Sequence, residues 1–273
     1  MTAVSIEGIW KEYGDKVVLE NVSLEVAPRS FCVVAGPSGC GKSTLLRLLL
    51  GQERPTRGRI RVDAEPLSPE PGPDRGVVFQ RYSVFPHLSV LGNVVLGLEL
   101  ERSKLLGKLF GAARRQAEAE ALHYLEAVGL ERERDSYPHA LSGGMRQRLS
   151  LAQALIRRPK ILLLDEPFAA LDPGTKDSIH DLVIELWEDA GMTIFLVTHD
   201  LREGFKLGTR LLILERLRID PHAPERFGAS ITYDLKVERR RSDAARRELA
   251  RRMAGESFAP PRKASIAAVR GAR

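Results

Sequence analysis

The chain has 273 residues, 43% of them hydrophobic, and carries a formal net charge of +6 at pH 7. That hydrophobic content is ordinary for a globular protein, and no apolar run reaches the ~20 residues that span a bilayer. The N-terminus has no basic-then-apolar signal segment, and two cysteines, Cys32 and Cys40, do not make a disulfide framework. A reducing cytosol is therefore expected.

The positive charge is concentrated at the C-terminus. Residues 236–273 contain twelve Lys or Arg and four Asp or Glu, so the first 235 residues carry about −2. Basic and aromatic residues are not interleaved in the way that suits stacking on bases. No nucleic acid is therefore expected as a partner.

The first predicted elements are short strands within residues 3–30, with a turn at Tyr13-Gly14-Asp15-Lys16. Their apolar residues alternate, as in strands with one buried face. Together with residues 58–62 they predict a small antiparallel sheet.

Residues 36–44, called the phosphate loop below, read Gly36-Pro37-Ser38-Gly39-Cys40-Gly41-Lys42-Ser43-Thr44. Backbone N–H groups of this motif wrap a polyphosphate, while its Lys and hydroxyl serve phosphate and Mg²⁺. A buried strand at 30–35 precedes the loop and a helix follows it, an order that aims a positive helix N-terminus at an anion. The alternative, a glycine-rich turn that binds nothing, does not require that order. The sequence therefore predicts a bound polyphosphate and Mg²⁺.

From Pro86 to about Ser142 the pattern becomes helical. Val90, Val94, Val95 and Leu98 share one helical face, and residues 114–128 form a second amphipathic helix that Gly129 closes.

A second anion site is predicted at Leu141-Ser142-Gly143-Gly144-Met145-Arg146-Gln147, called the signature segment below. A Ser hydroxyl and two glycine N–H groups are exposed there at the start of a helix. A helix capped by serine describes the same atoms but does not explain two successive glycines. Since one ATP molecule does not need two such sites in one chain, this one is expected to close over the nucleotide of a partner subunit.

The apolar strand at 161–165 ends in two carboxylates, Asp165 and Glu166. Asp165 can hold the Mg²⁺ that Ser43 also ligates, and Glu166 is placed to polarise an attacking water as general base. Adjacent acids are also common as plain surface charge. Their position after a phosphate loop favours the catalytic interpretation.

Alternating elements complete a parallel core, with strands at 161–165, 193–198 and 211–215 and a helix at 176–190. Beyond Glu215 the signals weaken. A further strand is predicted at 230–235, and a solvated basic tail is favoured over a membrane-surface helix at 238–253.

These motifs resemble the ATP-binding cassette (ABC) ATPases, over roughly residues 3–215. The resemblance implies an α/β fold: a P-loop ATPase core with a small antiparallel β subdomain and an inserted helical subdomain at about 86–150. Residues 1–215 would then be the ABC ATPase domain. Residues 216–273 would be a basic C-terminal extension, expected to be partly disordered.

Single residues fall where the family pattern places functional ones. Gln80 resembles the glutamine that reaches Mg²⁺ and the lytic water, and His199 resembles the switch histidine that contacts the γ-phosphate. Asp172 lies in the loop that carries messages between two ATP sites, and Tyr13 looks like the aromatic that stacks on adenine, with Trp10 as the alternative. The implied sets are Glu166, His199 and Lys42 for catalysis; Ser43, Gln80 and Asp165 for the metal; Tyr13, Gly36 to Thr44 and Gln80 for ATP; and Ser142, Gly143, Gly144 and Gln147 for the partner chain's ATP.

The chain has one cassette and no fused membrane domain, which is typical of the separate ATPase subunit of a bacterial transporter. The apolar residues within 82–88 are suited to line a groove that receives a helix of a membrane partner. The alternative is that they belong to the hydrophobic core of the helical subdomain. The expected partners are a second copy of the chain, integral membrane permease subunits and, indirectly, a solute-binding protein. The expected location is cytoplasmic, on the inner face of the cell membrane.

The direction of transport is inferred from Asp165-Glu166-Pro167-Phe168, which resembles importer subunits because Phe follows Pro. The extension of about 58 residues is too short for the regulatory barrel of sugar-uptake ATPases. The compact nitrate, sulfonate and taurine importers are therefore the most similar group, although residues 82–88 resemble polyamine and osmolyte importers, and Leu207-Gly208-Thr209-Arg210 departs from the usual Ala-Asp-Arg. A small nitrogen or sulfur compound, urea- or guanidine-like, is the expected solute. The alternative function is a soluble ABC ATPase that drives a non-transport assembly process.

Overall fold

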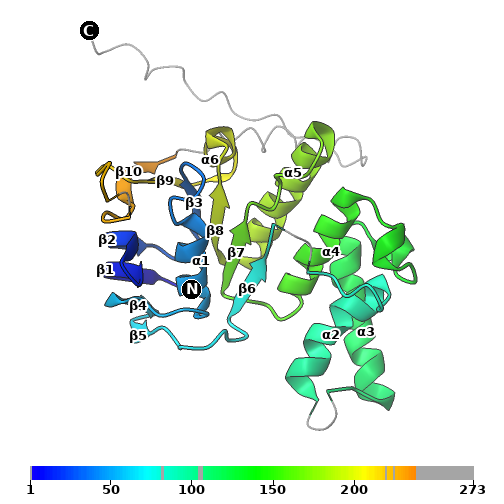
Figure 1. Ribbon diagram of the computed structural model, residues 1–273. Helices are drawn as coiled ribbons and strands as arrows, with labels where there is room; N and C mark the ends of the chain where they lie inside the picture. The colour runs from blue at the N-terminus through cyan, green and yellow to red at the C-terminus, as the bar shows by residue number, and fades with distance from the viewer. Residues whose placement is uncertain (1, 81–82, 104–106, 219, 224, 238–273) are drawn as a thin grey trace, which may run out of the picture. The chain divides into compact units, whose positions relative to one another are not determined.

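The computed structural model describes residues 2–80, 83–103, 107–218, 220–223 and 225–237 (Figure 1). These residues belong to one compact unit that spans Met1–Glu238. The basic segment considered at 238–253 lies outside the described residues.

The elements follow one another in an alternating order. They are β1 (Val4–Tyr13), β2 (Lys16–Val26), β3 (Phe31–Ala35), α1 (Lys42–Leu50), β4 (Arg57–Val62), β5 (Glu65–Pro66), β6 (Arg75–Val78), α2 (Val90–Arg102), α3 (Gly111–Ala127), the 3₁₀ turns η1 (Glu131–Glu133) and η2 (Pro138–Ala140), α4 (Gly143–Leu155), β7 (Ile161–Asp165), α5 (Pro173–Ala190), β8 (Thr193–Thr198), α6 (Leu201–Leu207), β9 (Arg210–Glu215) and β10 (Ser230–Lys236).

A six-stranded sheet, called the central sheet below, has the order β10-β9-β3-β8-β7-β6. Its pairs from β9 to β6 are parallel. Strands β3 and β8 are buried along their whole length, which explains their unbroken apolar sequences, because a parallel sheet is covered on both faces. The carboxyl ends of β3, β7 and β8 meet at one edge, where ligands of such sheets bind.

The central sheet separates two hydrophobic cores. Phe31, Val33 and Ala35 of β3 face the core shared with helices α2 to α5, whereas Cys32 and Val34 face the core shared with α1 and the smaller sheet. Successive residues of a strand point to opposite faces, which accounts for this division.

The smaller sheet has the order β2-β1-β4-β5 and is antiparallel, as predicted. Its strands β1 and β2 are joined by a tight turn in which Gly14 has a φ of +60°. The predicted face of α2 is confirmed, since Val90, Val94, Val95 and Leu98 are all fully buried. Within the described residues, no helix is both long and apolar enough to cross a membrane.

Residues 216–237 continue both sheets. Strand β10 pairs antiparallel with β9. The preceding residue, Ala229, donates its N–H to the Val18 carbonyl and accepts the Glu20 N–H, both at 2.9 Å. The boundary predicted at residue 215 therefore falls between two paired strands, and the compact unit continues to Glu238.

Candidate nucleotide-binding site

The phosphate loop joins β3 to α1 along a path that requires glycine. Gly39 and Gly41 have φ of +75° and +106°, a region that glycine enters without steric cost. A Cβ on Gly36 would lie 2.1 Å from the Leu214 carbonyl oxygen, and one on Gly41 would lie 2.9 Å from the Leu19 side chain. The loop backbone is therefore packed directly against β9 and β2.

Lys42 begins α1 and is buried beneath the loop. Its ammonium donates hydrogen bonds to the carbonyls of Gly36 and Pro37, each at 2.9 Å. Pro37, Ser38 and Gly39 are exposed at the loop's outer side. The N–H groups of Ser38 and Gly39 and the positive N-terminus of α1 can receive an anion.

Cys40 contributes its backbone rather than its thiol to this loop. Its side chain is buried, and burial raises the pKa of the thiol. A thiol that stays protonated is a poor nucleophile and metal ligand.

Ser43 and Asp165 lie next to each other at the base of the loop. The Ser43 hydroxyl donates to Asp165 Oδ1 at 3.0 Å, across 122 residues of sequence. Burial raises the pKa of the Asp165 carboxyl, as it does for a carboxylate without a full set of partners. Hydroxyl and carboxylate oxygens are the ligands that Mg²⁺ prefers, so these two residues fit that ion.

Gln80, the third predicted metal residue, is exposed just beyond β6. The register between β6 and β7 places Val78 beside Leu164. Two residues further on, Gln80 therefore reaches the level of Glu166, at the same edge of the sheet.

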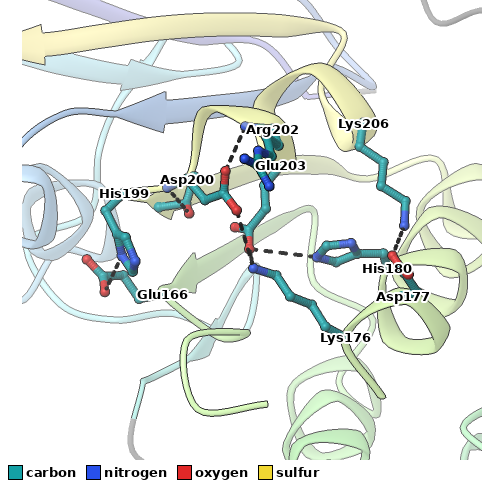
Figure 2. Close-up of polar contacts among 10 residues, drawn as sticks. Glu166, Lys176, Asp177, His180, His199, Asp200, Arg202, Glu203 and Lys206 are labelled. Carbon is teal, nitrogen blue, oxygen red and sulfur yellow. Dashed lines mark hydrogen bonds and ion pairs between the residues drawn. The ribbon is translucent and has the colours of Figure 1, made fainter. Parts of the chain in front are cut away.

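Glu166 and His199 form a polar contact at this edge (Figure 2). Glu166 Oε2 lies 3.2 Å from His199 Nδ1. The Glu166 backbone has a φ of +45°, and its N–H donates to the Val197 carbonyl at 3.0 Å. A non-glycine residue held in this conformation is strained, and such strain is concentrated at functional sites.

The signature segment opens α4. Ser142 is exposed and caps the helix, because its hydroxyl accepts the Met145 N–H at 3.2 Å. A Cβ on Gly144 would lie 2.3 Å from a Thr175 methyl carbon. One of the two glycines is therefore required for close packing of α4 on α5, a reason that the sequence alone did not give.

Gln147 differs from its predicted place at the surface. Its side chain is 0% exposed, and its amide atoms have no polar partner among the described residues. Gln147 follows Gly144 by three residues, which puts it on the helix face that packs on α5. In this structure the Gln147 side chain is not available to a nucleotide on a second chain.

Tyr13 and Asp172 are the two remaining predicted site residues. The pKa of Tyr13 is raised by burial and by its hydrogen bond to Glu53, with the Thr44 hydroxyl acting in the opposite direction. The contact with Thr44, the last residue of the phosphate loop, places Tyr13 beside that loop. Asp172 is exposed and caps α5 by accepting the Thr175 N–H at 3.0 Å.

A groove of about 390 Å³ lies between the segment after β6 and helices α2 and α4. Phe79, Ser83 and Phe85 line it, and Phe85 is 42% exposed. The buried Asn93 fixes this segment by accepting the Phe85 N–H at 2.7 Å and donating to the Phe85 and Leu88 carbonyls at 3.0 Å. Nothing in the sequence pattern distinguished Asn93 from a solvent-facing residue.

Residues 19–169 match the family model described as ABC transporter. The chain is 39% identical to a nitrate import ATP-binding protein of Synechocystis, over 82% of this chain and 84% of that protein. It is 40% identical to an aliphatic sulfonates import ATP-binding protein of Escherichia coli, over 87% of this chain and 89% of that protein.

Among solved structures, a dimeric ATP-binding cassette bound to ADP and Pi is 28% identical, with a TM-score of 0.69. That match covers 86% of this chain and 99% of the other. The phosphate loop, the acidic strand end and the signature segment occur in this chain within the same fold. The chain therefore belongs to the ABC transporter family.

Proposed function

We propose that the chain is the ATP-hydrolysing subunit of a bacterial ABC importer and energises uptake of a small solute through separate membrane permease subunits. One observation carries this proposal. The hydrogen bond between Ser43 and Asp165 joins the phosphate loop to the acidic strand end, so phosphate binding and metal binding meet at one point. Their location, at the carboxyl edge of a parallel sheet, is where such folds bind nucleotides.

Each residue of the site has a chemical role in this proposal. The loop N–H groups and Lys42 would bind the phosphates, Tyr13 would stack on the adenine, and Ser43, Asp165 and Gln80 would hold Mg²⁺. When bound, Mg²⁺ neutralises charge that develops on the phosphate oxygens. Glu166 takes the proton of the attacking water as general base. His199, which is 3.2 Å from Glu166, orients that carboxylate and contacts the γ-phosphate.

The ATP site is completed by a second copy of the chain. Ser142 is exposed, whereas Gly143 is half-buried and Gly144 is buried. The Ser142 hydroxyl and the N–H groups of Gly143 and Gly144 would contact the γ-phosphate held by the partner. Solved cassettes of similar fold are described as dimeric, which supports this arrangement. Asp172 is exposed at the start of α5 and would lie between the two ATP sites of the dimer.

The permease subunits are proposed to dock in the groove beside Phe85, with the complex on the inner face of the cell membrane and a solute-binding protein outside. Relatives are named for import of nitrate, taurine and aliphatic sulfonates. The proposed solute is accordingly a small nitrogen or sulfur compound. Genes for a permease and a binding protein next to this one would support import over an assembly role, and thermal-shift screening of that binding protein would identify the solute.

The catalytic proposal is tested with purified protein. Glu166→Gln should keep ATP affinity and lose turnover by at least ~10²-fold, the usual scale for a lost general base. The matched control is Glu131→Gln on the exposed turn η1, which should hydrolyse ATP like the wild type. Unchanged turnover in Glu166→Gln would refute the assignment.

A further inference from the structure

A cluster of charged residues joins α5 to α6 beside the site (Figure 2). Lys176 of α5 pairs with Glu203 of α6, and its ammonium lies 3.6 Å from Asp200 Oδ2. The Glu203 side chain is only 5% exposed, whereas that of Lys176 is 24% exposed. A carboxylate buried to this extent needs a cation beside it, so α6 depends on Lys176 for its place against α5.

Asp200 links this cluster to the site because it directly follows His199. Its N–H donates to the Thr198 hydroxyl at 3.0 Å, and its Oδ1 accepts the Arg202 N–H at 2.9 Å. The other carboxylate oxygen faces Lys176. The His199 side chain itself is 58% exposed, so packing does little to hold it. The position of His199 is therefore set mainly by the residues next to it in the sequence. Of these, Asp200 contacts another helix, through Lys176 of α5.

His180 shows why Lys176, and not a histidine, is the cation at Glu203. Its Nε2 lies 3.9 Å from Glu203 Oε1, but burial, and then Lys206 and Lys176, lower the pKa of His180 to about 4. The charged groups around it are Lys176 and Asp177 on α5, Asp200 at the N-cap of α6, and Glu203 and Lys206 on α6. At neutral pH the imidazole is therefore uncharged, and Lys176 alone of the two neutralises Glu203.

The same helix continues to the segment proposed to lie between the two ATP sites. Helix α5 begins at its cap, Asp172, one turn before Lys176. Phe168, two residues after Glu166, packs its ring at 4.5 Å on His180. A displacement of the Asp172 segment would therefore displace Lys176 and, through the contact with Asp200, would also displace His199.

We propose that Lys176 is a positioning residue for His199, which holds the His199–Asp200 turn on α5 so that the imidazole stays against Glu166. The inference rests on the proposed function, since it assumes that Glu166 and His199 act on ATP. It adds a route by which the segment at Asp172 controls the histidine within one chain.

The experiment compares two lysines that bridge the same helices. Lys176→Met should lower kcat for ATP hydrolysis about tenfold, because a catalytic group displaced by a fraction of an ångström loses much of its effect. KM for ATP should stay within about twofold, since the phosphate loop is untouched. Lys206, which pairs with Asp177 at the exposed side of α5, is the matched control. Lys206→Met should keep wild-type kcat and KM.

Two further variants separate positioning from folding. Lys176→Arg keeps the cation and should restore most of kcat. Lys176→Met combined with Glu203→Gln leaves no unpaired buried charge, so the protein should melt near the wild-type temperature while kcat stays low. Wild-type kcat in Lys176→Met, or an equal loss in Lys206→Met, would overturn the proposal. If Glu166→Gln is inactive and Lys176→Met is fully active, the role of Lys176 is refuted and the proposed function stands. If Glu166→Gln is active, the proposed function itself is refuted.

Discussion

The left-handed backbone at Glu166 predicts that function and stability conflict at this residue. With φ at +45°, a side chain with a Cβ is in a conformation that costs about 1–2 kcal/mol for L-residues. Glycine avoids that cost but loses about 0.4–1 kcal/mol through the greater freedom of its unfolded chain. From the middle of each range, Glu166→Gly should therefore be about 0.8 kcal/mol more stable than Glu166→Ala.

Alanine is the matched comparison because both variants lack the carboxylate and its contact with His199. In thermal unfolding without nucleotide, the glycine variant should melt about 1–4 °C above the alanine variant for a domain of this size. Both should have lost ATP turnover to the same extent. An alanine variant that is as stable as the glycine variant, or more stable, would show that the Glu166 backbone is not strained in solution.

Three other outcomes follow from the geometry. Gly36→Ala should weaken ATP binding at least about tenfold in a nucleotide titration, because its Cβ would meet the Leu214 carbonyl at 2.1 Å; unchanged affinity would contradict the packing described. A chain ending at Glu215 should melt well below one ending at Glu238, since it loses β10 and the hydrogen bonds between Ala229 and β2; equal melting temperatures would show that 216–237 add nothing. Burial raises the pKa of Asp165 in the folded chain. The free energy of unfolding therefore falls as pH rises through that pKa, because the buried carboxyl then becomes charged. Asp165→Asn stays uncharged, so it should raise Tm more at about pH 7 than at about pH 4. A gain that is independent of pH would contradict this.

The parts of the fold that were predicted from sequence are those with a local signal. Unbroken apolar runs such as 161–165 and 193–198 indicate strands that are covered on both faces. The phosphate loop is recognisable because its glycines and Lys42 stand at fixed spacing. Such features depend on neighbours in the sequence, so they can be read before any tertiary contact is known.

The parts that were not predicted depend on contacts between distant residues. Nothing in the sequence around Glu166 indicates a positive φ, which is uncommon outside Gly, Asn and Asp. Gln147 is buried because Gly144 allows α4 to approach Thr175 of α5. The bridge between Ala229 and Leu19 of β2 joins residues about 200 positions apart in the chain. Lys176 is likewise an ordinary helix-surface lysine until α6 is placed beside it.

The central claim is that each ATP is held by the phosphate loop of one chain and the signature segment of another. A symmetric dimer satisfies it, because an isologous interface gives each chain's second site to the other's nucleotide. When Lys42→Ala and Ser142→Arg protomers are mixed, each mixed dimer has two different ATP sites. One site contains both substitutions, and the other contains an unchanged Lys42 and an unchanged Ser142.

Trapping of labelled nucleotide is the most direct measurement of this claim. Each variant alone should fail to form ATP-stabilised dimers, and the mixture should trap about one nucleotide per mixed dimer. If mixed dimers form and trap none, the site is not shared between chains and the account is wrong.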